Sequence, residues 1–201
     1  VGETTYYRDA GRTTLSLGVE AIRNAVKDAG LELSDIDGMT SYQLGDSASS
    51  NHIATSLGIR LNYSVDISGG GSRTEALIGN TIGLLEAGYC KTMVICRSMK
   101  GRSGVRRGGP APGRPVPPTR AAGDNQFMMP WGWTAPAQLF GMSAMRYLHD
   151  TGTTTKSLAE VAGAHRRHAS LNPKAVMRNP ITIEDHQNSR WVVKPLRLLD
   201  C

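Results

Sequence analysis

The residues best placed to do chemistry form the run Ser68-Gly69-Gly70-Gly71-Ser72. This run lies between a predicted strand over residues 63–67 and a predicted helix over 73–87. Such a junction places backbone N–H groups and a helix N-terminus at the end of a sheet, where they can bind an anion or stabilise a developing negative charge. Glycines carry no reactive side chain. The run therefore predicts a cradle without a nucleophile, and the alternative is a tight turn that needs small residues for packing.

The net charge of +6 comes from one arginine-rich stretch, residues 97–120, which holds seven Lys or Arg and no acid. Without these seven, 16 basic residues face 17 acidic ones. Arg106 and Arg107 lie where five glycines and five prolines, within 101–118, predict a long irregular loop. Arg side chains suit phosphate oxygens, so we expect this loop to bind a phosphorylated small molecule, with a solvated linker as the alternative. The lack of interleaved aromatic residues argues against nucleic acid as a partner.

The three cysteines have no metal-ligand spacing, and their odd number suits a reducing cytosol. Cys90 and Cys96 are expected to pack in the interior rather than to act as nucleophiles. His165 and His168 lie three residues apart on a predicted helix without an evident third ligand, so no metal site is predicted. No apolar run approaches the about 18 residues of a membrane span, and the N-terminus shows no signal peptide. We therefore expect a cytoplasmic protein without a membrane span.

Helices and strands alternate in the first half of the chain. Apolar residues at helical spacing predict a helix over 13–29 that stops at Gly30 and another over 51–57 that ends at Gly58. Strands are predicted over 36–39, 63–67 and 92–96, and the helix over 73–87 separates the last two. This βαβ alternation predicts an α/β fold with a mostly parallel, doubly wound sheet.

After the arginine-rich stretch the chain turns helical. We predict a helix over 137–149, a second over 157–170 that opens with a capping box from Ser157 to Glu160, and a short third helix capped by Thr182. A strand is predicted over 191–193. Trp131, Trp133 and Phe140 either line an apolar pocket or are buried under a loop in the ordinary way. The predicted division is 1–98 as an α/β core, 99–190 as a mainly helical loop subdomain, and 191–201 as a return strand.

Five segments in order along the chain together resemble the thiolase superfamily. They are DISGGGS (66–72), EAG (86–88), PAQLFGMSA (136–144), HASLNPKA (168–175) and PLRLLDC (195–201). The resemblance is greatest to the branch of sterol-carrier-protein-type thiolases and bacterial lipid-transfer-protein-like aldolases of steroid side-chain degradation. It implies a layered βαβαβ fold, of which this chain matches the N-terminal half with its loop subdomain. We expect the second half, with its catalytic tyrosine or histidine, to lie outside the chain.

One departure from the thiolase pattern bears directly on the reaction. In thiolases the helix after this strand opens with a catalytic cysteine, in a pattern like C-x-S-G-x-x-A. Setting that alanine on Ala76 places the cysteine position at Gly70. Without a thiolate there, the covalent acyl-enzyme step has no nucleophile.

The resemblance therefore implies an aldolase that acts on acyl-CoA thioesters, with retro-aldol C–C cleavage of a β-hydroxyacyl-CoA carrying a steroid side chain. Backbone N–H groups around Gly70, Gly71 and Ser72 are the candidates for stabilising the enolate. Candidate contacts to the substrate and its coenzyme A are Arg106, Arg107, Gln138 and Met142. No cofactor is expected beyond the coenzyme A of the substrate. Expected partners are a second copy, in a thiolase-type homodimer, and a small acyl-CoA-binding protein with an OB fold.

Two other functions remain open at this point. One is an ordinary thiolase, or acetyl-CoA acyltransferase, in which a remaining cysteine replaces the missing one. The other is a non-catalytic carrier or scaffold for acyl-CoA or lipid. Half of a doubly wound pair would expose the apolar face that meets its other half, so we also expect poor solubility of this chain in isolation.

Overall fold

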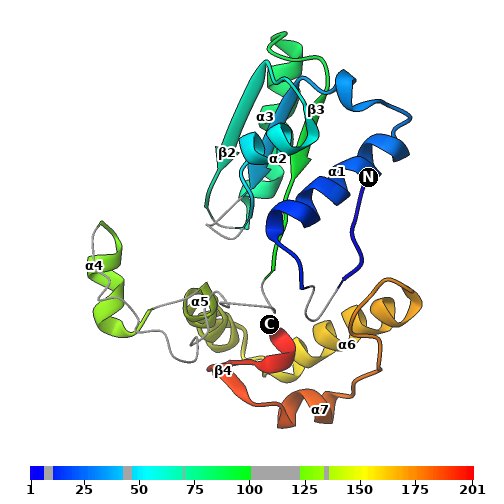
Figure 1. The fold of residues 1–201 in the computed structure, drawn as a ribbon. Helices are drawn as coiled ribbons and strands as arrows, with labels where there is room; N and C mark the ends of the chain where they lie inside the picture. The colour runs from blue at the N-terminus through cyan, green and yellow to red at the C-terminus, as the bar shows by residue number, and fades with distance from the viewer. Residues whose placement is uncertain (7–10, 43–46, 70, 101–122, 134–135) are drawn as a thin grey trace. The chain divides into compact units, whose positions relative to one another are not determined.

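The computed structural model describes residues 1–6, 11–42, 47–69, 71–100, 123–133 and 136–201. The chain forms two compact units, Val1–Ala111 and Pro112–Cys201, and each is described by itself (Figure 1). The predicted division at residues 98 and 190 stays a prediction.

The first unit is built around a parallel sheet of three strands. These are β1 (Gly38–Tyr42), β2 (Tyr63–Ile67) and β3 (Met93–Cys96), in the order β2-β1-β3. Both neighbours of β1 run parallel to it, with Gly38 opposite Tyr63 and Met93. The predicted parallel α/β arrangement is confirmed.

The predicted strand over 36–39 is wrong at both ends, because β1 begins at Gly38 and continues to Tyr42. A 3-10 turn over Leu33–Asp35 precedes it, and the Ile36 amide donates to the Leu33 carbonyl. Asp37 is then held by its carboxylate, which accepts hydrogen bonds from the backbone amides of Lys91 and Thr92 at 2.8 and 2.9 Å. Because of these contacts, Ile36 and Asp37 belong to the turn, and the strand begins after them.

Helices cover both faces of this sheet. On one face lie α1 (Thr14–Asp28) and α2 (Ser50–Leu57), whose N-termini are capped by the side chains of Thr13 and Ser49. The core on this face is formed by buried apolar side chains: Ile22, Val26, Ile36, Met39, Ile53, Ala54, Leu57 and Cys96. Gly58 ends α2 at φ +70°, a left-handed conformation that favours glycine. The predicted helices and their stops are confirmed here.

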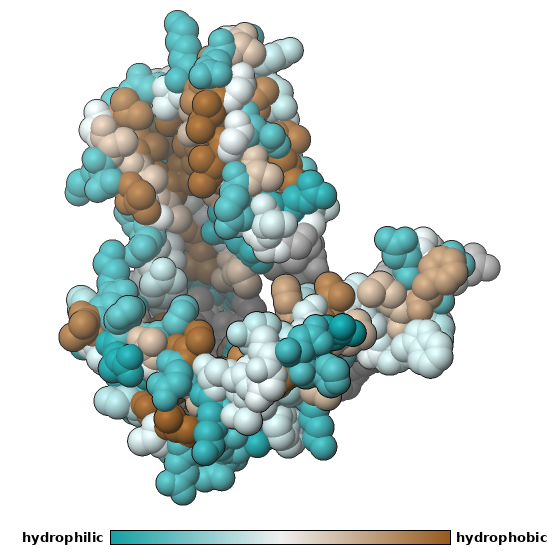
Figure 2. Space-filling model, turned by 180° about the vertical axis from the view of Figure 1, so that it is seen from behind, coloured by the Kyte–Doolittle hydropathy of each residue, from teal (hydrophilic) through white to brown (hydrophobic). Residues whose placement is uncertain are grey.

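The other face is covered by α3 (Arg73–Glu86), and this helix is largely exposed. Leu77 and Thr81 are its buried residues, whereas Ile78, Ile82 and Leu85 are 56%, 53% and 36% exposed. These three lie at the i, i+4, i+7 spacing of a single helix face, which makes an outward apolar stripe. Figure 2 shows apolar side chains gathered over the part of the molecule formed by the sheet and α3.

The second unit consists of helices around a short antiparallel hairpin. Its helices are α4 (Asn125–Met128), α5 (Pro136–Thr151), α6 (Lys156–Leu171) and α7 (Ile183–Asn188), and its strands are β4 (Trp191–Val193) and β5 (Leu196–Arg197). Thr182 caps α7 as predicted, in a reciprocal pair with Asp185. The predicted capping box at Ser157 is wrong. The helix begins earlier, at Lys156, and the Ser157 hydroxyl donates to the Thr154 carbonyl at 2.8 Å.

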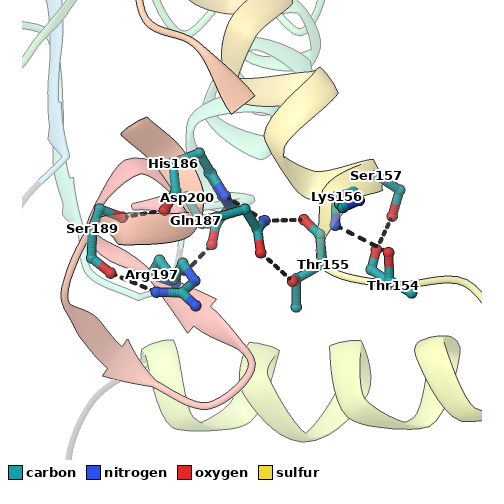
Figure 3. A network of polar contacts seen from close by, with 9 residues as sticks. All are labelled: Thr154, Thr155, Lys156, Ser157, His186, Gln187, Ser189, Arg197 and Asp200. Carbon is teal, nitrogen blue, oxygen red and sulfur yellow. Dashed lines mark hydrogen bonds and ion pairs between the residues drawn. The ribbon is translucent and has the colours of Figure 1, made fainter. Parts of the chain in front are cut away.

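A buried polar network ties α7 to the start of α6 and to the chain's last turn (Figure 3). The Gln187 side-chain amide accepts from the Thr155 hydroxyl and donates to the Thr155 carbonyl. The two contacts with Thr155 fix the orientation of the Gln187 amide, and its NH2 group lies 3.1 Å from His186 Nδ1. Because an NH2 group can only donate, His186 Nδ1 is the acceptor. His186 Nε2–H then donates to Asp200 Oδ1 at 2.6 Å, and His186 is 0% exposed. The network anchors the C-terminal half of α7 to the start of α6 and to residues 198–200.

Candidate active site

The glycine run lies where the sequence places it, at the carboxyl end of β2 and the start of α3. Gly69 has φ +152°, and a Cβ there would come within 2.7 Å of the Arg73 side chain. Gly71 and Ser72 are exposed, and Ser72 caps α3 without a side-chain hydrogen bond. Gly70 is outside the described residues. The first turn of α3 thus carries backbone N–H groups that the helix itself cannot pair.

One side chain from a neighbouring strand end contacts this run, and a second side chain contacts the first. Tyr42, the last residue of β1, is 2% exposed, and its hydroxyl donates to the Gly69 carbonyl at 2.7 Å. Arg97 directly follows β3, and its guanidinium carbon lies 4.3 Å from the centroid of the Tyr42 ring. Parallel strands bring their carboxyl ends to one edge of a sheet, where ligands bind in open α/β folds. The edge therefore carries the Tyr42 hydroxyl at the glycine run and the Arg97 cation over the Tyr42 ring.

Sequence reasoning missed the part played by Tyr42 and counted Arg97 only as a member of the basic stretch. A signal was available, because each residue stands at the carboxyl end of a predicted or observed parallel strand. The strand over 36–39 was predicted too short, and this error left Tyr42 beyond its end.

None of the three cysteines has the environment of a reactive thiolate. Burial raises the pKa of the Cys96 thiol to about 11, against a hydrogen bond from Ser41 and with support from the charge of Asp66. Burial also raises the pKa of Cys90, and the Asp37 carboxylate adds to this effect. The pKa of the exposed Cys201 is raised as well, by desolvation and by Asp200. A raised pKa keeps a thiol protonated and unreactive at neutral pH.

The second unit contains an apolar cavity of about 580 Å³. Its apolar lining comes from α4, α5, the turn between them and β4: Phe127, Met128, Trp131, Trp133, Met142, Met145 and Val193. Gln138 and Lys194 are its polar members. Gly141 of α5 permits the close approach of β4 that shapes this region, since a Cβ there would lie 3.2 Å from Val193 and 3.3 Å from the Lys194 carbonyl.

The structure thus brings the predicted contacts Gln138 and Met142 to one cavity, together with Trp131 and Trp133. Phe140 is 63% exposed and is not among the lining residues. Arg106 and Arg107 lie outside the described residues, so their role stays a prediction.

In the part of the chain that the structure describes, no three His, Cys, Asp or Glu side chains gather as a metal site would require. Nor does any described helix have the length and apolar character needed to span a bilayer.

Comparison with known proteins gives full-length matches for this chain. A steroid side-chain-cleaving aldolase from Thermomonospora curvata is 38% identical over all of this chain and 52% of its own length. A 17-hydroxy-3-oxo-4-pregnene-20-carboxyl-CoA lyase from Mycobacterium tuberculosis is 37% identical with the same coverage. An acetyl-CoA acetyltransferase from Methanothermobacter thermautotrophicus is 39% identical over 43% of this chain and 22% of its own.

Among solved structures, an Ltp2-ChsH2(DUF35) aldolase superposes on the whole of this chain with a TM-score of 0.86 and 37% identity. The match covers 50% of the chain in that solved structure. No family model matches the sequence. The chain spans about half the length of the two lyase relatives that it matches throughout.

Proposed function

We propose, from the premise that this chain belongs to the thiolase superfamily and to its lipid-transfer-protein-like aldolase branch, that it forms part of an enzyme that cleaves a carbon–carbon bond in an acyl-CoA thioester. The reaction is the retro-aldol cleavage of a β-hydroxyacyl-CoA whose acyl group carries a steroid. Support comes from the names of the two relatives that match this chain throughout, one a steroid side-chain-cleaving aldolase and the other a 17-hydroxy-3-oxo-4-pregnene-20-carboxyl-CoA lyase.

In this reaction a base removes the proton of the β-hydroxyl group, and that carbon becomes a ketone. The bond between the α and β carbons breaks, and its electron pair forms the enolate of the shortened thioester. A proton added at the α carbon gives the second product, a shorter acyl-CoA. The enzyme must supply the base and a site for the enolate oxygen. By the family resemblance we assign the base to a tyrosine or histidine outside this chain.

The observation that carries the proposal is the missing nucleophile. Glycine stands at position 70, where the thiolase pattern has cysteine, and no cysteine of this chain has a lowered thiol pKa. Acyl transfer through a thioester on the enzyme needs a thiolate, whereas retro-aldol cleavage does not.

The edge around the glycine run suits the enolate. Backbone N–H groups of Gly70, Gly71 and Ser72 are proposed to face the thioester oxygen, at the positive end of the α3 dipole. Tyr42 fixes the run through its hydrogen bond to the Gly69 carbonyl. The positively charged guanidinium group of Arg97 lies over the Tyr42 ring.

We also propose residues that contact the rest of the substrate, and partners for the chain. Arg106 and Arg107 are proposed to contact the phosphates of coenzyme A, and Gln138 and Met142 the acyl part; no further cofactor is proposed. The matching solved structure is an Ltp2-ChsH2(DUF35) aldolase, whose name pairs two components. This pairing supports a hetero-oligomer. From the family resemblance we propose that the partner is a small acyl-CoA-binding OB-fold protein and that the assembly is built on a thiolase-type homodimer.

The proposal is tested by incubating the protein, with any chain that co-purifies, with two steroid acyl-CoA thioesters that differ only in the β-hydroxyl group. The hydroxylated thioester should yield a steroid ketone and a shorter acyl-CoA, and its deoxy analogue should remain intact. Release of acetyl-CoA from a β-ketoacyl-CoA in the presence of free coenzyme A would favour a thiolase instead. Tight binding of both thioesters without any cleavage would favour a carrier.

A further inference from the structure

An arginine side chain lies against the glycine run. Arg73, the first residue of α3, folds back toward Gly69, because a Cβ on Gly69 would come within 2.7 Å of both Cγ and Nε of Arg73. The carbonyl of the same glycine accepts the hydrogen bond from the Tyr42 hydroxyl. Gly69 is thus fixed by Tyr42, and its lack of a side chain leaves room for the arginine.

The Arg73 guanidinium has no polar partner of its own. It is exposed, and it forms no hydrogen bond or ion pair with any residue that the structure describes. Glu75, the acidic residue of the same helical turn, accepts instead from the Thr74 hydroxyl at 3.0 Å. The helix dipole disfavours a cation in the first turn, so nothing in this turn compensates the charge of Arg73. An anion bound at the glycine run would do so.

The position of this arginine in the thiolase pattern connects it with the reaction. With the alanine of C-x-S-G-x-x-A set on Ala76, the glycine of the pattern falls on Arg73. The chain therefore lacks the cysteine at Gly70 and carries a cation three residues later, where the pattern has no side chain. The same turn has lost a nucleophile and gained a positive charge.

We propose that Arg73 is a catalytic residue of the retro-aldol cleavage, and that its guanidinium binds the thioester oxygen as the enolate forms. The inference rests on the proposed function. When the bond between the α and β carbons breaks, its electron pair forms the enolate, and the negative charge develops on the thioester oxygen. An arginine keeps its protons in proteins. Arg73 therefore stabilises the enolate by charge and hydrogen bonds, and another group supplies the proton for the α carbon.

A phosphate of coenzyme A is the other anion that an arginine at this position could bind. The geometry favours the enolate, since Arg73 folds over the run whose backbone N–H groups are proposed to face the thioester oxygen. The two sources differ in a measurable way. An enolate site changes kcat and responds to the charge of the acyl group, whereas a phosphate site affects every coenzyme A derivative alike.

The first experiment measures turnover of the hydroxylated steroid thioester by the protein, with any chain that co-purifies. Arg73→Gln should lower kcat about a hundredfold, which is the effect of removing one donor to a developing oxyanion, and should change KM less than about threefold. Arg60→Gln is the matched control, because Arg60 is an exposed arginine in the loop between α2 and the start of β2, and it should retain the wild-type kcat. Wild-type kcat in Arg73→Gln would overturn the proposal.

The second experiment needs no turnover. It compares two unreactive thioethers, S-carboxymethyl-coenzyme A and S-carbamoylmethyl-coenzyme A, which have nearly the same shape but differ in charge. Calorimetric titration should show that the wild-type protein binds the carboxylate at least about tenfold tighter than the amide, because hydrogen bonds to a charged group are the stronger ones. Arg73→Gln should remove most of this preference, and Arg60→Gln should leave it unchanged. Equal weakening of both thioethers by Arg73→Gln would assign the arginine to a phosphate and overturn the proposal.

Two further provisions keep these tests decisive. Arg73→Met, a neutral side chain of similar length, replaces Arg73→Gln if that variant does not fold, and a wild-type protein without any preference for the carboxylate would overturn the proposal by itself. Failure of the inference is also distinguishable from failure of the proposed function. Cleavage at the wild-type rate in the variant would refute the role of Arg73 and leave the lyase standing. A charge preference that depends on Arg73, without cleavage of any thioester, would refute the lyase and leave the anion site standing.

Discussion

The environment of Cys96 gives a quantitative test of whether a cysteine could replace the missing nucleophile. Cys96 is 8% exposed, and burial raises the pKa of its thiol to about 11. Free cysteine has a pKa of about 8.5, so Cys96 should carry on the order of a hundredfold less thiolate at neutral pH. Alkylation proceeds through the thiolate, and the rate should fall by at least that factor.

The assay is iodoacetamide labelling at pH 7, with each cysteine peptide quantified by mass spectrometry over time. The urea-unfolded chain is the control for each cysteine, because unfolding removes the effects of burial. Native Cys96 should react at least about a hundredfold more slowly than unfolded Cys96, and the Cys96→Ala variant should retain turnover. The reasoning would be refuted if native Cys96 reacted within tenfold of its unfolded rate and its labelling abolished turnover.

Three further predictions concern the sheet and its edge. Tyr42→Phe removes the hydrogen bond to the Gly69 carbonyl and should lower stability by about 1 kcal/mol and abolish most of the turnover. Tyr89→Phe, at an exposed tyrosine, is the control and should change neither quantity. Equal turnover in the two variants would count against the site. Hydrogen bonds from backbone amides lower the pKa of Asp37, so its stabilisation is complete above its unfolded pKa and is lost as pH falls through the folded value. Asp37→Asn should therefore destabilise the protein in urea at pH 7, with a difference that shrinks toward pH 2; a pH-independent difference would contradict this. Leu77 is 1% exposed, so Leu77→Ala should lower the free energy of unfolding by about 2–5 kcal/mol. Ile78→Gln, on the outward stripe of α3, should leave that free energy nearly unchanged and should reduce self-association measured by sedimentation. Unaltered association would refute a role of the stripe in self-association.

Local signals in the sequence predicted most of the first unit. The glycine stops at Gly30 and Gly58 and the apolar spacing of α1 and α2 fixed those helices well, and β2 was predicted with its observed bounds. The start of β1 was misjudged because Asp37 accepts hydrogen bonds from residues more than 50 positions away. Such long-range contacts have no local pattern.

The candidate site was predictable where it depends on backbone and missed where it depends on neighbours. The glycine run can be recognised from its composition alone. The contacts of Tyr42 with Gly69 and Arg97 depend on the order of the strands in the sheet, which cannot be read from the sequence. Likewise, the sequence indicates Trp131 and Trp133 as candidate pocket residues and Gln138 and Met142 as candidate substrate contacts, but it does not relate the two pairs. Their meeting in one cavity depends on how α4, α5 and β4 pack.

The central claim is C–C cleavage without a covalent acyl-enzyme, and intact-mass spectrometry during turnover tests it most directly. The protein, with any chain that co-purifies, is mixed with a steroid β-hydroxyacyl-CoA and quenched in acid at times when product is accumulating. The account predicts a steroid ketone and a shorter acyl-CoA in equal amounts, with the mass of this chain unchanged. An acyl adduct on Cys90, Cys96 or Cys201 that forms and decays at the rate of turnover would contradict it.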